Sequence, residues 1–530
     1  MTVEPLVTGA ARASPSRRSR LGPGWSIATL LVVTVTSVPL VSLFGQLVAG
    51  GITRTIPSDR LAALLARTLA LGVTVTITAL ALGMATAWLT TRTAIPGRRM
   101  WMVLAGLPLV IPSYVAALAI IGATGPGGLV QSIVDIEVPT PYGFIGAWLG
   151  LSLFLAPMAH LVLVPAFQRI DRTTEEAAAG LGAGRGRVLR SITIPLLRPG
   201  LVSAGLMISL YAISDFGAVS LLRYDTLTRA IYTLYQGQID RRPAGTLALL
   251  LALVALGILW LERLARSRAN YHSTRPTRTR ELLRLGGGGT TGALIFLTSY
   301  VTLTLVVPIA VMAHWLRRGI AAGARLAPVL EELGRSMGIA TAAAILVTLA
   351  AIPIAMWTVR SRSRLSEFPR GLAWSSYAIP HISVGVAVVT FALTTARPLY
   401  QTLGLLMLTY LAMFVAQSGG SIEDSLHRIS PDLEDASRGL GHGAVASFLR
   451  ITVPLLRPGM LAGAALVFLS VMKELPATLI LRPNGFETLA VRIWSATGEG
   501  FYAQASLAGL TLLAVSILPL LAVIRRDLSN

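Results

Sequence analysis

Residues Arg169 to Gly200 read RIDRTTEEAAAGLGAGRGRVLRSITIPLLRPG, and residues Arg428 to Gly459 read RISPDLEDASRGLGHGAVASFLRITVPLLRPG. The two stretches align without a gap at an offset of 259 residues (428 − 169), with 16 identities in 32 positions. Each is a polar loop between long apolar runs. Simple duplication predicts equal divergence everywhere, yet the first spans of the two halves share little. The conserved loop therefore indicates a docking surface for a partner.

The composition is that of an integral membrane protein. Hydrophobic residues make up 54% of the 530 residues and charged residues only 13%, whereas soluble domains are about 25% charged. The chain contains no cysteine, which excludes disulfides and thiolate metal sites. Its net charge of +21 does not indicate a nucleic-acid partner, because the arginines follow the expected membrane topology.

We expect an all-α membrane fold, since a helix needs about 20 apolar residues to cross a bilayer. The twelve expected spans are residues 25–48, 66–90, 101–124, 143–167, 201–222, 244–264, 291–316, 336–359, 371–394, 398–418, 458–481 and 503–524. Six spans separate equivalent points of the repeated loops. An even number keeps both halves in one orientation, so the fold consists of two parallel six-helix repeats rather than inverted ones.

The arginines set the expected orientation. With the N-terminus inside, 30 arginines fall in cytoplasmic segments and 14 in external ones, as the positive-inside rule requires. Both termini and both repeated loops are then cytoplasmic. The first apolar run is too long for a signal peptide and is expected to stay as a span. The expected divisions are a basic N-terminus at 1–24, a first half at 25–265, an Arg/Gly linker at 266–290 and a second half at 291–530.

Each repeated loop is expected to form a helix–turn–helix. Residues 172–179 and 432–438 form its first helices, and glycine ends them, as it commonly ends helices. The expected terminators are Gly180 and Gly182 in the first loop and Gly439 and Gly441 in the second. A second helix is expected to reach Pro195 or Pro454, with the next span opening at 198–200 or 457–459.

No ATPase site is expected in this chain. A phosphate-binding P-loop needs Gly-Lys followed by Ser or Thr. The single lysine of the sequence, Lys473, stands between Met472 and Glu474. We also find no nucleophile elbow and no histidine–carboxylate metal motif, so no catalytic residue, metal site or bound cofactor is expected here. If ATP drives the protein, a partner chain holds the ATP and its Mg²⁺.

The first loop resembles the EAA motif of ABC importer permeases. Glu176-Ala177-Ala178, three residues, Gly182, nine residues and then Ile192 with Pro195 follow that pattern, with Ile194 in place of its usual leucine. The second copy departs further, with Asp435 for Glu, Ser437 for Ala and Val453 for Leu.

This resemblance covers essentially the whole chain and implies a type I importer permease with two fused halves. It implies partners: two copies of an ABC ATPase, each taking one loop into a groove, and an extracytoplasmic substrate-binding protein, in a bacterial cytoplasmic membrane. The residues expected to dock are Glu175, Glu176, Ala177, Ala178, Gly182, Ile192, Pro195, Glu434, Asp435, Ala436, Ser437, Gly441, Ile451 and Pro454.

The stretches 473–478, 111–115 and 214–217 resemble the ferric-iron branch of these permeases. That resemblance implies iron as cargo, with thiamine, aminophosphonate or polyamine as alternatives. A carrier driven by an ion gradient is the alternative from another class, and it would not need duplicated cytoplasmic loops.

Asp215 and Glu474 occupy equivalent positions (215 + 259 = 474) near the ends of two spans. Ionisable residues at membrane depth usually face a pathway or a partner. Paired carboxylates suit a hard cation such as Fe³⁺, but each also has a neighbouring base. Asp215 is equally expected to pair with Arg223, and Glu474 with Arg482 or Lys473. The other expected pathway residues are Tyr114, Tyr211 and Tyr377, while His160 and His381 are expected to be packing residues.

Overall fold

The computed structural model describes residues 23–50, 56–170, 177–178, 180–237, 240–267, 282–324, 328–361 and 367–529. In these residues the regular elements are helices, apart from one isolated bridge between Thr93 and Leu283. The first half contains α1 (Pro23–Gly50), α2 (Ser58–Arg92), α3 (Arg98–Gly106), α4 (Ser113–Thr124), α5 (Leu129–Val134), α6 (Phe144–Arg169), α8 (Arg185–Val188), α9 (Ile194–Ser214), α10 (Gly217–Leu221), α11 (Leu227–Gly237) and α12 (Arg242–Ser267).

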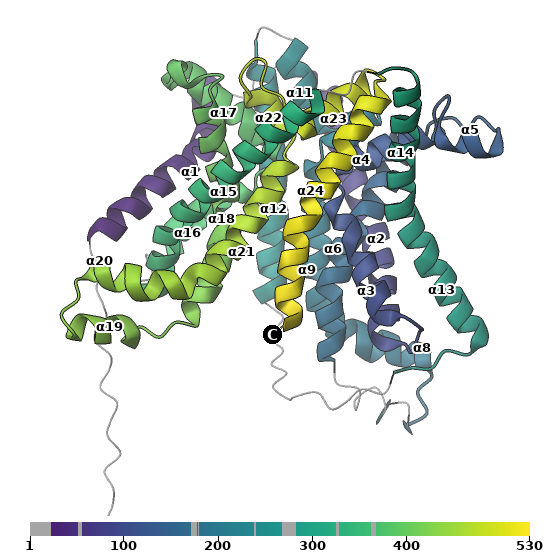
Figure 1. Ribbon diagram of the computed structural model, residues 1–530, viewed down its shortest axis with the longest axis horizontal. Helices are drawn as coiled ribbons and strands as arrows, with labels where there is room; N and C mark the ends of the chain where they lie inside the picture. The colour runs from purple at the N-terminus through teal and green to yellow at the C-terminus, as the bar shows by residue number, and fades with distance from the viewer. Residues whose placement is uncertain are drawn as a thin grey trace, which may run out of the picture.

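The second half repeats this order (Figure 1). It contains α13 (Gly287–Val301), α14 (Val307–Ala321), α15 (Pro328–Arg360), α16 (Glu367–Ser375), α17 (His381–Thr395), α18 (Leu403–His427), α19 (Asp432–Gly439), α20 (Ala444–Ser447), α21 (Val453–Met472), α22 (Pro476–Leu481), α23 (Leu489–Gly498) and α24 (Tyr502–Ser529). Helices α8 and α19 lie at opposite ends of one face, which we call the loop face. Helices α11, α22 and α23 lie on the opposite side, the far face (Figure 1).

Among the described residues, ten helices are long and apolar enough to cross a membrane. The bent pair Phe368–Ala378 and His381–Thr395 makes an eleventh if it counts as one span, and α24 adds a shorter apolar stretch, Tyr502–Ile517. The all-α membrane fold is therefore confirmed. The number of spans stays a prediction at twelve.

Two expected spans are wrong as continuous helices. Residues 101–124 are interrupted at Ile111 and Pro112, and residues 371–394 turn by 108° at Ile379 and Pro380. A proline pushes the residue before it into an extended conformation. Ile111 (ψ 116°) and Ile379 (ψ 135°) both adopt it, so each span consists of two separate helices.

The expected spans 201–222 and 458–481 differ at both ends. On the far side they stop early, at Ser214 and Met472, and short helices α10 and α22 follow. On the loop side the helix continues through Pro195 and Pro454, where we expected it to end. A π-helical segment, η2 (Leu189–Thr193) or η7 (Phe448–Thr452), precedes each proline. This wider turn accommodates a residue that has no N–H to donate.

The first span of each half packs on the other half. Helix α1 lies against α15, α16, α17 and α18, with Thr29 donating to the Pro353 carbonyl (3.1 Å) and Ser42 to that of Ala387 (2.8 Å). Helix α14 packs on α4 in return, and Trp315 donates to the Gly122 carbonyl at 2.9 Å. The two halves are therefore interlocked.

The linker is shorter than the expected 266–290. Helix α12 continues to Ser267, and Gly287 begins α13, so the glycines from 287 open a helix. Leu283 is fixed to the end of α2, since its N–H donates to the Arg92 carbonyl and its carbonyl accepts from Ala94, both at 2.9 Å. Residues 268–281 of the linker lie outside the described part of the chain, as do residues 1–22 of the N-terminus.

Candidate functional site

The second repeated loop is a short helix closed by a glycine. In α19, the N–H of Gly441 donates to the Arg438 carbonyl (3.0 Å) and that of His442 to the Ser437 carbonyl (3.2 Å). This pair of bonds is a Schellman motif, which requires a left-handed residue at the position of Gly441. Gly441 has φ +87°, a conformation that only glycine adopts without strain.

The first loop has the same geometry where it is described. Ala177, Ala178 and Gly180 are helical, Ala183 donates to the Ala178 carbonyl (3.0 Å), and Gly182 has φ +85°. Gly180 and Gly439 lie inside their helices, so Gly182 and Gly441 are the terminating residues. Glu175 and Glu176, expected to dock, lie outside the described residues.

Two of the expected docking residues hold α19 in place. Glu434 accepts a hydrogen bond from the Thr452 hydroxyl (2.8 Å) and lies 3.6 Å from the Arg360 guanidinium, which also donates to the Ile429 carbonyl. Ser437 is only 6% exposed and shares a hydrogen bond with Ser447 at 2.9 Å. Glu434 therefore faces α15 and η7, and Ser437 faces α20, rather than a partner.

The exposed surface of each loop is centred on a leucine. Leu181 and Leu440 are 90% and 81% exposed, at equivalent positions just before the terminating glycines. Of the expected docking residues, Asp435, Ala436, Ala177 and Pro195 are also exposed, while Ile192, Ile451 and Pro454 are half-buried. The two leucines were missed from the sequence. Their signal was the Gly-Leu-Gly that the two loops share.

Asp215 and Glu474 both lie where a span is broken. The Asp215 carboxylate accepts hydrogen bonds from the N–H groups of Ala218 (3.0 Å) and Val219 (3.3 Å) at the start of α10. Glu474 accepts one from Ala477 (2.9 Å) at the start of α22. The two carboxylates therefore cap equivalent short helices, as side-chain acceptors commonly do at a helix start.

Each carboxylate has a second partner on the neighbouring broken span of its own half. The Ser113 hydroxyl at the start of α4 bonds to Asp215, and His381 Nδ1 at the start of α17 lies 2.6 Å from Glu474 Oε2. The expected base partners are wrong, because Arg482 pairs instead with Glu487 (3.4 Å) and Arg223 lies over the Tyr142 ring. His381 is more than a packing residue, while His160 bonds to Thr86 and the Met102 carbonyl.

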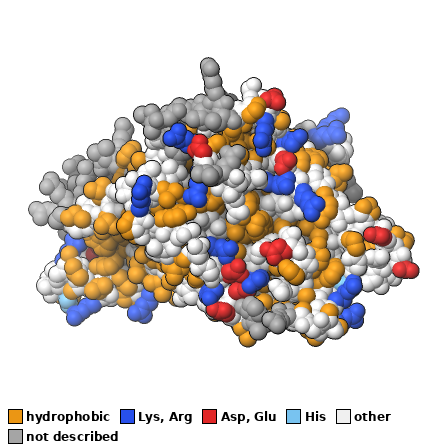
Figure 2. Space-filling model, turned by 90° about the horizontal axis from the view of Figure 1, so that it is seen from above, with side chains coloured by type: hydrophobic (Ala, Val, Ile, Leu, Met, Phe, Trp, Pro, Cys, Tyr) orange, Lys and Arg blue, Asp and Glu red, His pale blue; other side chains and the backbone are white. Residues whose placement is uncertain are grey.

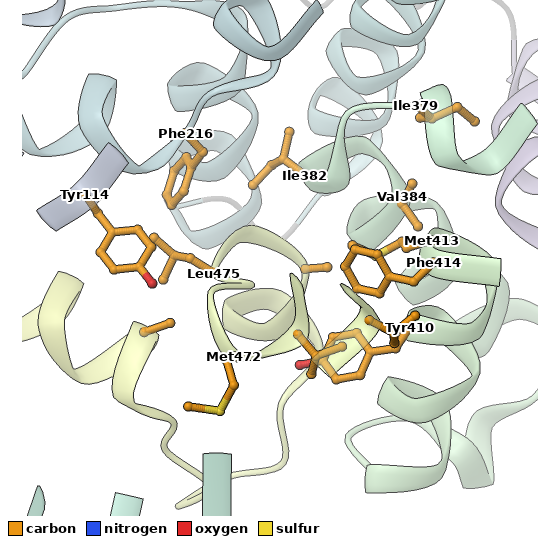
Figure 3. Packing of buried hydrophobic residues seen from close by; sticks show 14 of the residues in the cluster. Tyr114, Phe216, Ile379, Ile382, Val384, Tyr410, Met413, Phe414, Met472 and Leu475 are labelled. Carbon is orange, nitrogen blue, oxygen red and sulfur yellow. The ribbon is translucent and has the colours of Figure 1, made fainter. Parts of the chain in front are cut away.

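The two halves meet directly near the far face, along what we call the seam, formed by Leu109, Tyr114, Ser220, Lys473 and Trp494. The Tyr114 hydroxyl donates to the Lys473 carbonyl (3.4 Å), and the Lys473 ammonium donates to the Leu109 carbonyl (3.5 Å). Tyr114 lies beside Leu475 in this region (Figure 3).

Trp494 makes a further contact across the seam. Its indole N–H donates to the Ser220 hydroxyl at 2.7 Å, and its ring packs against Phe216 and Tyr232 with centroids 5.7 and 5.4 Å apart. Burial raises the pKa of Tyr232 to about 12, so this phenol stays neutral at physiological pH. The seam is therefore a polar and aromatic contact without a cross-seam ion pair among the residues named here.

Helices α9 and α21, which follow the repeated loops, make no close contact with each other in the part of the chain that the structure describes. Among the described residues, α9 and α21 do not pack against each other, since α9 packs on α2, α6 and α12 and α21 on α15, α18 and α24. Tyr211 on α9 and Tyr377 beside α17 are 44% and 47% exposed. They come from opposite halves of the chain. The halves therefore contact each other at the seam, whereas α9 and α21 each pack within their own half.

The loop that follows α22 is clamped to the second half by ion pairs. Arg492 contacts Glu332 and lies 2.8 Å from Glu487, while Arg335 donates to the Gly485 carbonyl (2.9 Å). Acidic and basic side chains lie interspersed among apolar ones when the molecule is seen from above (Figure 2).

Comparison with known proteins identifies the fold. A family profile described as "Binding-protein-dependent transport system inner membrane component" matches residues 79–267. The Fe(3+)-transport system permease protein FbpB 2 of Haemophilus influenzae is 30% identical over 94% of this chain and 98% of its own length. This chain belongs to the binding-protein-dependent transport permease family.

Other permeases of the family match it as well. The probable ABC transporter permease protein y4fN of Sinorhizobium fredii is 25% identical over 86% of both chains. The molybdenum transport system permease protein ModB of Escherichia coli is 31% identical and corresponds to 34% of this chain and 85% of its own length. The second of these matches covers about a third of this chain but most of ModB, as expected if ModB corresponds to only one of two fused halves.

Membership of this permease family establishes the general function of the chain. The chain is the multi-pass membrane permease of a binding-protein-dependent ABC importer, and a permease is the non-catalytic component of such a system. Its partners in that family are an ATPase and a substrate-binding protein. The described residues contain no group of three or more His, Asp or Glu side chains placed to hold a metal ion, so Asp215 and Glu474 do not complete a binding cage.

Proposed function

We propose that this permease imports ferric iron. The observation that carries the proposal is the relative named as an Fe(3+)-transport permease, which matches over both halves rather than one. Relatives named for molybdenum or 2-aminoethylphosphonate correspond to 34% and 27% of the chain. The second of these supports aminophosphonate cargo less well than iron, because it matches a smaller part of the chain, and thiamine and polyamine stay as alternatives.

Two copies of an ABC ATPase are proposed to dock on the loop face. The two loops have the same glycine-terminated geometry, and each presents an exposed leucine. The loop face is then cytoplasmic, and both termini lie in the cytoplasm. ATP and Mg²⁺ belong to the ATPase, and no cofactor is assigned to this chain. The membrane is proposed to be the bacterial cytoplasmic membrane.

Transport is proposed to follow alternating access. The seam closes the far, extracytoplasmic end, and α9 and α21 stand apart towards the loop face. Closure of the ATPase dimer would bring the loops together. Because η2 and η7 join each loop to α9 and α21 without a break, that movement reaches the seam through a single continuous helix in each half.

The test is uptake of radiolabelled iron by proteoliposomes that contain the permease, its ATPase and its binding protein. We expect ATP-dependent accumulation of ⁵⁵Fe and none of labelled thiamine. Iron uptake that continues without the ATPase would favour a carrier driven by an ion gradient. Thiamine uptake without iron uptake would overturn the cargo assignment.

Docking is tested separately at the terminating glycines. A valine at Gly182 or Gly441 must adopt a left-handed conformation, which strains the loop by roughly 1–2 kcal/mol. We expect Gly441→Val to weaken co-purification of the ATPase. Gly443→Ala is the matched control, because Gly443 has φ −65° and open space around it. Equal ATPase retention in Gly441→Val and the control would remove the docking assignment.

A further inference from the structure

The walls of the seam contain few charged groups. The broken spans that meet near the seam lie in residues 105–122, 199–222, 371–396 and 459–481, and, tyrosines apart, their acidic and basic side chains are Asp215, His381, Lys473 and Glu474. A cargo that passes this point meets the charges of these four side chains and the hydroxyls of the nearby tyrosines. Which of the four face the pathway therefore decides what cargo charge is accepted.

The two carboxylates are buried and already have partners. Asp215 and Glu474 are 6% and 5% exposed. Asp215 is engaged by two backbone N–H groups and by Ser113, all within the first half. Glu474 is engaged by the Ala477 N–H and by His381, both within the second half. His381 is itself directed at Glu474, so neither the acids nor the histidine present an unused charge.

Lys473 is different. Its half-buried side chain reaches across to the first half, where its exposed hydrogen bond to the Leu109 carbonyl is long (3.5 Å). An ammonium has three N–H donors, and a single weak bond to a neutral carbonyl leaves it available to an anion. Tyr211 and Tyr377 add partly exposed tyrosine side chains from opposite halves. Lys473 at the seam and the two tyrosines on its loop-face side are thus the polar groups that remain available to a cargo.

We infer that Lys473 contacts the cargo, and that the cargo crosses the seam bearing anionic oxygen groups, carboxylate or phosphate, rather than as a bare trivalent cation. A bare Fe³⁺ would be repelled three times as strongly as a monovalent ion at the same distance, because Coulomb energy follows the product of the charges. An anionic oxygen ligand reverses the sign of the interaction and accepts a charge-assisted hydrogen bond from the ammonium. This inference rests on the proposed import of iron.

The absence of cysteine from the natural sequence makes the charge directly testable. Lys473→Cys removes the ammonium, and reaction with aminoethyl methanethiosulfonate puts one back at nearly the same distance from the backbone. We expect ⁵⁵Fe uptake by the complete importer in proteoliposomes to fall about tenfold or more in the variant, as when a charge-assisted hydrogen bond is lost. The aminoethyl reagent should restore it, and the neutral ethyl reagent should not.

The neutral reagent separates the inference from a purely structural role. If Lys473 only holds the seam shut, a side chain of the same size without charge restores uptake as well as the charged one does, and the inference is overturned. The same holds if Lys473→Cys keeps wild-type uptake. Should Lys473→Cys fail to assemble with the ATPase, Lys473→Arg and Lys473→Met replace it, with uptake expected in the arginine variant and not in the methionine variant.

Ser214→Cys is the matched control, since Ser214 is the equivalent position of the first half (473 − 259 = 214). Its modification by the aminoethyl reagent should leave uptake within about twofold of the wild-type rate. Iron is supplied in two arms, with citrate or with inorganic phosphate. Charge-dependent rescue in one arm identifies the accompanying ligand, and rescue in neither arm overturns the inference. Wild-type protein that takes up no iron at all would instead contradict the proposed function.

Discussion

His381 Nδ1 lies 2.6 Å from Glu474 Oε2, and this contact joins the start of α17 to the start of α22. Two helix breaks that are 93 residues apart in the sequence are thereby held together. The first half uses Ser113 and Asp215 at the equivalent places. The two halves thus share one geometry but differ in the chemistry of the contact.

This difference predicts that shortening the His381 and Ser113 side chains to alanine lowers the stability of the protein by unequal amounts. His381→Ala removes one of two partners of a buried carboxylate and should destabilise the protein by about 2 kcal/mol. Ser113→Ala should cost about 1 kcal/mol, because Asp215 keeps two backbone N–H donors. Thermal unfolding of each variant in detergent, followed by tryptophan fluorescence, measures both effects. An equal or larger shift for Ser113→Ala would contradict the prediction.

The Ser437–Ser447 pair predicts a non-additive result. The first loop has Ala178 and Val188 at these positions, so an apolar pair fits the same geometry. Ser447→Val alone leaves a buried hydroxyl unpaired and should cost about 1–3 kcal/mol, whereas Ser437→Ala with Ser447→Val should be nearly neutral. The comparison is a double-mutant cycle on thermal stability. If the double variant loses as much stability as the two single variants combined, the Ser437–Ser447 hydrogen bond does not account for the loss in the single variants.

The exposed side chains of Leu181 and Leu440 lead to a prediction of how many ATPase subunits each permease variant binds. An aspartate at an exposed apolar anchor should weaken docking by about 2 kcal/mol, roughly thirtyfold in Kd. Native mass spectrometry should show two ATPases on the wild type, one on Leu181→Asp or Leu440→Asp, and none on the double variant. Leucine-to-methionine changes are the control, since they keep the apolar contact. Two ATPases on the double aspartate variant would rule out these leucines as anchors.

If the seam must open during transport, a cross-link between its two sides should block uptake. Cysteines in place of Ser220 and Trp494, joined by a cleavable bifunctional reagent, should abolish uptake while the ATPase stays bound, and cleavage should restore uptake. Cysteines in place of Ser42 and Ala387 form the control, because these residues join α1 to α17 and are expected to move as one body. Normal uptake by the cross-linked Ser220/Trp494 variant would show that the seam does not open.

Much of the architecture was predictable from the sequence. Each expected span contains an apolar helix, because hydropathy over about 20 residues is a strong signal. The breaks were not predicted. Pro112 and Pro380 were visible, but proline is common in membrane helices and does not by itself divide a span. Pro195 shows the opposite error, since the helix continues through it after a π-helical turn.

The site was predicted only in part. The loops were identified because their sequence repeats, yet Ser437 proved to be buried and Leu440 to be the exposed residue. The partner of Glu474 was expected to be Arg482 or Lys473 and was found on another helix, at His381. Such long-range pairs depend on how the broken spans are brought together, and no local pattern in the sequence records that.

The exchange of first spans has a consequence for biosynthesis. Thr29 of α1 bonds to Pro353, which the ribosome adds 324 residues later. At about 5–20 residues per second, this interval is roughly 15–65 seconds. During that time the earliest span waits in the bilayer without its final neighbours, exposed to lipid and to quality-control proteases. Fusion of the halves into one polypeptide guarantees that the awaited surface arrives on the same chain, so maturation does not depend on an encounter between separately made subunits.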